Sequence, residues 1–280
     1  MSMYKIIIDS CGELSEELKQ DGHFQTVSLE LEVDGYRIRD DETFNQLDFL
    51  RRVKESAAGP KSSCPSPEQY MSAYEGEAEH VYAVTLSAEL SGSYNSAVLG
   101  KNLYEEEYGE KQIHVFNSRS ASVGETLIAL KIQECEEAGM EFEQVIEQVN
   151  AFIEEQHTYF VLESLEALRK NGRLTGIKAL VATALNIKPV MGSTPEGTIY
   201  QLGQGRGIKK ALAKMGDSVA AEAIHPEQKI LAISHCNAPE RAEAVRKMIQ
   251  EKIQVKDSFI VDTRGVSSLY ASDGGIIVVI

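Results

Sequence analysis

A junction rich in hydroxyl side chains, between an expected strand and an expected helix, is the part of this sequence best suited to binding chemistry. The stretch from Thr85 to Ala97 reads Thr-Leu-Ser-Ala-Glu-Leu-Ser-Gly-Ser-Tyr-Asn-Ser-Ala and follows the short apolar run 81–84. The first N–H groups of a helix lack partners and carry partial positive charge, so small hydroxyl residues and glycine there can hold a carboxylate or a phosphate. Taken alone, this segment is better explained as a plain helix N-cap, which needs no ligand.

A second hydroxyl-rich turn also leads into an expected helix. The stretch from Lys61 to Tyr70 reads Lys-Ser-Ser-Cys-Pro-Ser-Pro-Glu-Gln-Tyr. Pro65 and Pro67 restrict the backbone, and Glu68 places negative charge in the first turn of the helix, where the dipole favours it. Two such turns in one domain can converge on a single anion.

The ordered set of motifs resembles the DegV family of bacterial lipid-binding proteins. Residues 62–66, Ser-Ser-Cys-Pro-Ser, resemble the Thr-Ser-Gln-Pro-Ser turn of the family, and Ser87 to Tyr94 resembles its Ser-Ser-x-Leu-Ser-Gly-Thr-Tyr turn. Further matches are Ile8-Asp-Ser10, Leu165 to Leu174 and Leu185 to Val190. Each motif is weak alone, but their order spans nearly the whole chain. The resemblance implies a DegV-like fold with the ligand site at the junction of two α/β domains.

The resemblance also implies that Ser62 and Ser91 hold the carboxylate of a long-chain fatty acid. In the family, the first hydroxyl of the Thr-Ser-Gln-Pro turn and the serine of Leu-Ser-Gly have this role, and a serine at position 62 keeps the donor. Five neighbouring residues can add contacts to the same ligand: Ser63, Gly92, Ser93, Asp9 and Ser10. Turn and cap roles explain all these residues without a ligand.

Two further candidates lie in the second half of the chain. Arg173 matches the arginine of a family Gly-Gly-Arg motif, and it can bind the ligand head group, contact a docked kinase or form a surface salt bridge. Tyr270 falls where many members carry a histidine, and a phenol donates a hydrogen bond but is a poor base near neutral pH. If that histidine assists phosphoryl transfer in the family, this chain only binds its ligand or uses another residue, such as His235.

Composition excludes several classes of function. The 280 residues favour two domains, and the net charge of −15 argues against nucleic acid as a partner. The four cysteines are far apart and have no histidine at metal-binding spacing, so we expect reduced thiols and no metal site. No apolar run approaches the ~20 residues that a membrane helix requires, so we expect a cytoplasmic protein with only transient membrane contact.

Strands alternate with helices along the chain, which predicts an α/β fold with mainly parallel sheets. The pattern restarts after residue 156, and we therefore expect domains at 1–156 and 157–280. An apolar helix is expected at 175–184. It offers a tunnel lining for an acyl chain, or plain core, through Leu180, Val181, Ala184, Leu185 and the following Ile187.

The resemblance implies a fatty-acid carrier, not an enzyme, that presents its ligand to a separate kinase. The sequence has neither a G-x-x-x-x-G-K-[ST] loop nor a G-x-G-x-x-G after a strand, so ATP would be bound by another protein and no cofactor is expected. Two alternatives stay open. One is a serine-dependent lipid hydrolase, although a G-x-S-x-G elbow is absent. The other is a binder of a phosphorylated small molecule, because the same hydroxyl cradle fits phosphate.

Overall fold

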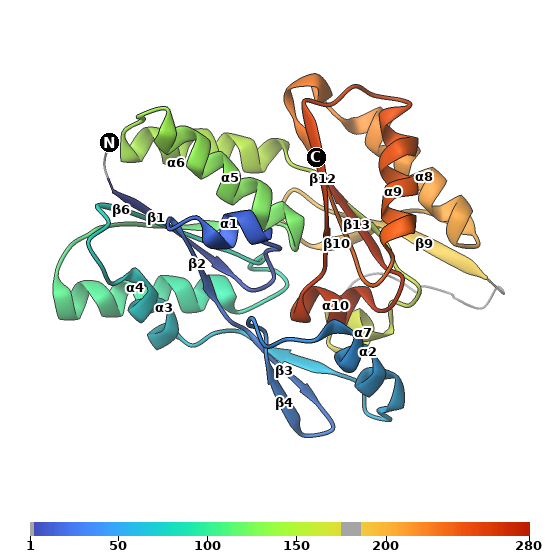
Figure 1. The fold of residues 1–280 in the computed structure, drawn as a ribbon, viewed down its shortest axis with the longest axis horizontal. Coiled ribbons are helices and arrows are strands. Elements are labelled where there is room, and N and C mark those ends of the chain that lie inside the picture. The colour runs from blue at the N-terminus through green and yellow to red at the C-terminus, as the bar shows by residue number, and fades with distance from the viewer. Residues whose placement is uncertain (1–2, 175–185) are drawn as a thin grey trace.

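A parallel sheet forms the first half of the fold in a computed structural model that describes residues 3–174 and 186–280. Its strands run in the order β2-β1-β6-β7 (Figure 1): β2 (Phe24–Val27), β1 (Tyr4–Asp9), β6 (His80–Thr85) and β7 (Gln112–Asn117). Helices cover both faces, with α5 (Val123–Glu137) and α6 (Phe142–Glu155) on one face and α3 (Pro67–Tyr74) and α4 (Ser93–Tyr108) on the other. Strand β6 is wholly buried, since Tyr82 and Val84 face α5 and α6 while Val81 and Ala83 face α3 and α4.

The second sheet is mixed, so the expectation of mainly parallel sheets is right for the first sheet and wrong for this one. Its order is β10-β9-β8-β13-β11-β12, and only β11 and β12 run parallel. The direction differs because β9 and β10 form a hairpin, and because β13, the last strand, inserts between β8 and β11. The strands are β8 (Thr158–Val161), β9 (Ile187–Ser193), β10 (Ile199–Arg206), β11 (Ile230–His235), β12 (Asp257–Asp262) and β13 (Ile276–Val279).

The remaining elements complete the α/β architecture. The second half carries α7 (Glu166–Lys170), α8 (Ile208–Glu222), a 3-10 turn (Pro226–Gln228), α9 (Pro239–Gln250) and α10 (Gly265–Ala271). The first half also carries α1 (Glu16–Gln20) and α2 (Gln46–Glu55). Among the described residues, none of the helices combines the length and the apolar character needed to cross a bilayer. The apolar helix expected at 175–184, with Leu180, Val181, Ala184 and Leu185, lies outside the described residues.

A small antiparallel sheet projects from the molecule and carries Ser62 (Figure 1). It consists of β3 (Glu30–Val33), β4 (Tyr36–Arg39) and β5 (Lys61–Ser63), with Ser62 opposite Leu31. The turn between β3 and β4 is Asp34-Gly35, where both residues have positive φ, as the sequence predicts for a tight hairpin.

Helix α5 joins the two larger sheets. Its Val123 and Leu127 pack against Ala232 and Val279 of the second sheet, while its Ile128 and Ile132 belong to the core of the first. The strands of the first sheet all precede residue 156 and those of the second all follow it. The division into domains at 156 stays a prediction.

The close packing of α3 on α4 depends on Gly100. A Cβ atom at this position would lie 2.6 Å from the carbonyl oxygen of Pro67 and 2.8 Å from Cβ of Tyr70. Both helices begin directly after the hydroxyl-rich turns, so this contact holds the two turns side by side.

We predict that Gly100→Ala lowers the free energy of unfolding by about 2 kcal/mol, because the added methyl group overpacks the α3–α4 interface. Denaturant unfolding followed by circular dichroism measures the change. Gly22→Ala is the control, because a Cβ there meets nothing within 4 Å, and it should change stability by less than about 0.5 kcal/mol. Equal effects of the two substitutions would contradict the predicted packing.

Candidate functional site

The carboxylate of Asp9 organises the loops at the carboxyl end of the first sheet. It is fully buried at the end of β1, where Oδ1 accepts a hydrogen bond from the backbone N–H of Cys11 at 3.0 Å. Its Oδ2 accepts from the N–H of Leu86 at 2.9 Å and from the hydroxyl of Ser93 at 2.6 Å. Ser93 is buried in turn and lies 2.8 Å from the phenol oxygen of Tyr70. These bonds fix the loop from 86 to 93, which carries Ser91.

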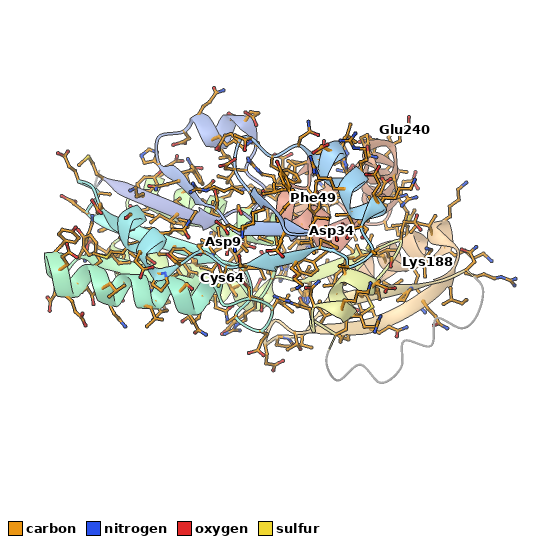
Figure 2. The ribbon with its side chains drawn as sticks, turned by 90° about the horizontal axis from the view of Figure 1, so that it is seen from below. Asp9, Asp34, Phe49, Cys64, Lys188 and Glu240 are labelled. Carbon is orange, nitrogen blue, oxygen red and sulfur yellow. The ribbon has the colours of Figure 1, made fainter. Side chains whose placement is uncertain are left out.

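The two hydroxyl-rich turns lie against each other, as the sequence predicts. Cys64, in the turn after β5, has its sulfur 3.8 Å from the hydroxyl of Ser96 on α4, and a Cβ at Gly92 would lie 3.1 Å from that sulfur. In Figure 2 the labels of Asp9 and Cys64 stand close together, left of the centre of the view. Ser91 is half-buried, and its hydroxyl accepts from the N–H of Ser93 at 3.2 Å.

Tyr270 and Arg173 join the turn that contains Ser62. The phenol oxygen of Tyr270, on α10, lies 3.0 Å from the hydroxyl oxygen of Ser62. The guanidinium carbon of Arg173 lies 5.6 Å from the centre of the Tyr270 ring, and its Nε donates to the carbonyl of Leu90 at 3.0 Å. Within the described part of the chain, Arg173 forms no ion pair, so the surface salt bridge that the sequence left open is not observed.

The other predicted site residues are placed as follows. Ser63 and Gly92 are exposed beside the two turns. Ser10 is buried, and its hydroxyl accepts from the N–H of Leu29 at 3.0 Å. His235, the suggested substitute for the family histidine, is buried with Nδ1 3.1 Å from Asp262 and 3.2 Å from the N–H of Ala238. Ligand contact stays a prediction for every member of the set.

A narrow apolar cavity lies behind Tyr270, between the two larger sheets. Its volume is about 90 Å³, below the roughly 300–1,000 Å³ of common ligand pockets. Its surface is almost entirely apolar, and Ile187 does not line it. The apolar lining comes from both halves of the chain and includes Leu86, Leu90, Phe160, Leu162, Val266 and Ile277.

Comparison with known proteins identifies the family. A family model described as an uncharacterised protein of the DegV family matches residues 3–280. The chain belongs to the DegV family. The sequence is 33% identical over 278 residues to a DegV domain-containing protein of Streptococcus pyogenes serotype M1, covering 98% of each chain.

Solved structures of DegV proteins share the fold. A DegV family protein from Ruminococcus gnavus, refined with vaccenic acid, is 64% identical and has a TM-score of 0.97, with 99% of each chain covered. The fatty acid kinase (Fak) B3 protein of Streptococcus pneumoniae, loaded with linoleic acid, is 31% identical and has a TM-score of 0.88. That match covers 99% of this chain and 98% of the other.

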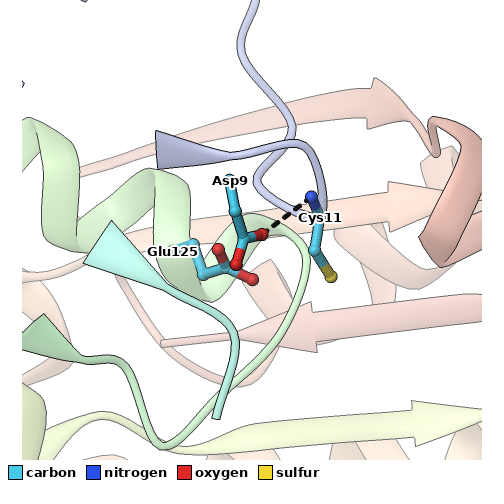
Figure 3. A group of neighbouring side chains, drawn as sticks. All are labelled: Asp9, Cys11 and Glu125. Carbon is cyan, nitrogen blue, oxygen red and sulfur yellow. Dashed lines mark hydrogen bonds between the residues drawn. The ribbon is translucent and has the colours of Figure 1, made fainter. Parts of the chain in front are cut away.

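In this DegV protein, buried carboxyl groups lie beneath the loop that carries Ser91. Figure 3 shows Asp9 beside Glu125 of α5 and Cys11. Each of these residues offers one atom that could bind a metal ion, and the three atoms lie within 4.8 Å of one another. Asp9, however, already accepts three hydrogen bonds. Both carboxyl oxygens of Glu125 are buried without a hydrogen-bond partner among the described residues. Burial and then the charge of Asp9 raise the pKa of Glu125 well above its ordinary value, which favours its neutral acid form.

Two more buried carboxyl groups hold the start of α10, the helix that carries Tyr270. Glu13 accepts from the N–H of Arg264 at 2.9 Å, and burial raises its pKa to about 8. Asp40 accepts from the N–H groups of Gly265 and Val266 at 2.8 and 2.9 Å, and burial raises its pKa to about 6. Sequence reasoning missed these anchors, because Asp40 and Gly265 are 225 positions apart and no local pattern links them.

We predict that stability falls as pH rises from 4.5 to about 8, partly because of Glu13. A raised pKa means that the folded state keeps a proton that the unfolded chain releases. Rising pH therefore stabilises the unfolded state relative to the folded state. One such group lowers the free energy of unfolding by up to about 1.4 kcal/mol per pH unit within this window. Denaturant unfolding at a series of pH values measures the slope.

Glu13→Gln should flatten this slope, because the amide keeps an acceptor for Arg264 and does not titrate. Glu16→Gln, in the exposed first turn of α1, is the matched control and should leave the slope unchanged. Parallel curves for wild type and Glu13→Gln would show that Glu13 is ionised in the folded protein.

Proposed function

We propose that this chain binds a long-chain fatty acid, with the acyl chain in the apolar cavity and the carboxylate at Ser62 and Ser91. The observation that carries the proposal is the position of Tyr270. This residue lines the cavity, and its phenol oxygen lies 3.0 Å from the hydroxyl of Ser62, so the apolar space ends at hydroxyl donors. A narrow apolar space that ends in a few polar groups suits a single-headed lipid.

The relatives support the same ligand class. The Ruminococcus gnavus protein was refined with vaccenic acid, and the Streptococcus pneumoniae protein was loaded with linoleic acid. Each CH₂ group that leaves water contributes about 0.8 kcal/mol, so the acyl chain would supply most of the affinity. The cavity is narrow, and we expect its leucine and phenylalanine side chains to change rotamer when a chain enters.

The head group would be recognised by neutral donors with one cation nearby. Ser62, Ser91 and Tyr270 supply hydroxyl groups, and Arg173 supplies a guanidinium group that stacks near the tyrosine ring. Charge-assisted hydrogen bonds to a carboxylate are stronger than neutral ones, which favours the ionised acid. Asp9 and Ser93 would act indirectly, by fixing the loop that carries Ser91.

We further propose a cytoplasmic carrier that presents the carboxylate to a separate ATP-dependent kinase subunit, with only transient membrane contact. The relationship to a protein named as part of a fatty acid kinase supports this role. With Tyr270 in place of the family histidine, this chain would bind and orient the acid without acting as a base near neutral pH.

The two alternatives fit the contacts less well. A serine hydrolase needs a base beside its nucleophile, yet in the described structure Ser93 donates to Asp9 and Ser91 accepts from a backbone N–H, and neither bonds to a histidine. A phosphorylated small molecule without an apolar chain would leave the apolar cavity behind Tyr270 unfilled.

We predict that Ser62→Ala and Ser91→Ala each weaken hexadecanoic acid binding about tenfold, the effect of losing one hydrogen bond to a charged group. Isothermal titration of delipidated protein measures the dissociation constants. Ser218→Ala, on α8, is the control and should bind the acid as wild type does. Wild-type affinity in both variants would place the carboxylate elsewhere. Absence of fatty acids from organic extracts of the purified protein, with no thermal shift on adding them, would refute the proposed function.

We also predict that a fluorophosphonate probe leaves Ser91 and Ser93 unlabelled, because neither hydroxyl bonds to a histidine among the described residues. Intact-mass spectrometry after incubation reports labelling, with a known serine hydrolase as the positive control. A stoichiometric adduct on either serine would support the hydrolase instead.

A further inference from the structure

A second group of polar side chains lines the apolar cavity, apart from Tyr270 and Arg173. It comprises Arg119, Ser120, Thr158 and Ser193. The hydroxyl oxygens of Ser120 and Thr158 lie 2.6 Å apart, which joins the end of the first sheet to the start of β8. Arg119 has positive φ (52°), and its Cα lies against Gly197, where a Cβ would come within 2.8 Å. The backbone is therefore tightly held at this place.

Two residues of this group, Arg119 and Ser193, also line a second and more polar cavity. The second cavity has a volume of about 390 Å³, and its lining includes Arg119, Gln156, His157, Ser193, Tyr200 and Glu222. Arg119 and Ser193 line both cavities, whereas Tyr270 and Arg173 line only the apolar one. A ligand chain that runs away from Ser62 through the apolar cavity can therefore reach polar surroundings at Arg119.

One buried polar atom here lacks a partner within the described part of the protein. The amide oxygen of Gln156 is buried without a hydrogen-bond partner in the described structure. Its amide nitrogen and the Ser120 hydroxyl both lie within 3.1 Å of the point where a Cβ of Gly124 would stand, so the amide adjoins the wall of the apolar cavity. The guanidinium group of Arg119 forms no ion pair with any described residue. A buried acceptor and a half-exposed cation thus line the same cavity, and the acceptor costs free energy while it is unsatisfied.

A hydroxyl group matches this pair better than a methyl group or a second carboxylate. A hydroxyl both accepts and donates a hydrogen bond, whereas a carboxylate can only accept and cannot satisfy the Gln156 oxygen. Glu154 and Glu222 also line the polar cavity and would repel an anion. A terminal methyl group would leave the Gln156 oxygen without a partner.

We propose that Arg119 and Gln156 form a second polar subsite that binds a hydroxyl group at the far end of the acyl chain, so that the protein accepts ω-hydroxy long-chain fatty acids. This inference rests on the proposed function, because it assumes that the carboxylate lies at Ser62 and Ser91. The contacts of the carboxylate set the orientation of the bound fatty acid, and the subsite adds selectivity for a hydroxyl group at the end of its acyl chain.

Titration of delipidated protein with hexadecanoic acid and 16-hydroxyhexadecanoic acid, and with their tetradecanoic and octadecanoic counterparts, tests the subsite. At the chain length that reaches Arg119, wild type should bind the hydroxy acid about tenfold tighter than the plain acid. Arg119→Leu and Gln156→Leu should each bring the ratio of the two affinities to about one. This ratio is taken within one variant, so a change in its affinity for the plain acid does not affect the test. Arg37→Leu, on the exposed β3–β4 hairpin, is the matched control and should keep the preference.

Thermal melts of all variants establish that they fold. If wild type binds the plain acids but prefers no hydroxy acid at any length, the subsite is refuted and the proposed function stands. Persistence of the preference in both leucine variants also refutes the subsite. If no acid of either kind binds, the proposed function itself fails.

Discussion

The Asp9 carboxylate is buried at the end of the first strand and bonds to three separate pieces of backbone and side chain. A buried carboxylate is costly unless it is fully hydrogen-bonded, and the N–H groups of Cys11 and Leu86 with the Ser93 hydroxyl supply that compensation. Two of these bonds fix the loop that carries Ser91 at the end of β1. The position of Ser91 in the candidate head-group site therefore depends on one buried side chain.

The cavity depends on how the two halves of the chain are joined. Helix α5 packs on both larger sheets, and α10 brings Tyr270 to the small sheet that carries Ser62. Asp40 fixes the start of α10 through the N–H groups of Gly265 and Val266, where a negative charge also favours the helix dipole. Buried carboxyl groups with raised pKa values, including those of Glu13 and Asp40, thus position the apolar wall of a lipid site.

Much of this arrangement could be predicted from sequence, and the reasons for the failures are physical. The apolar strand at 81–84 and the hydroxyl-rich turns that precede α3 and α4 are local patterns, and the sequence predicted all three. The antiparallel insertion of β13 was missed, because strand direction is set by connections and not by the residues of the strand. The contact of Gly265 with Asp40 was missed as well, because it joins residues 225 positions apart. By contrast, the family resemblance assigned Tyr270 and Ser62 to one site, and their hydroxyl oxygens lie 3.0 Å apart.

A crystal structure of the protein with hexadecanoic acid tests the central claim most directly. The account predicts continuous density for the acyl chain through the cavity between Tyr270 and Arg119, with a carboxylate oxygen about 3 Å from the Ser62 hydroxyl. A carboxylate bound at Arg119 with the methyl end at Tyr270 would contradict it, and so would a lipid found only on the surface.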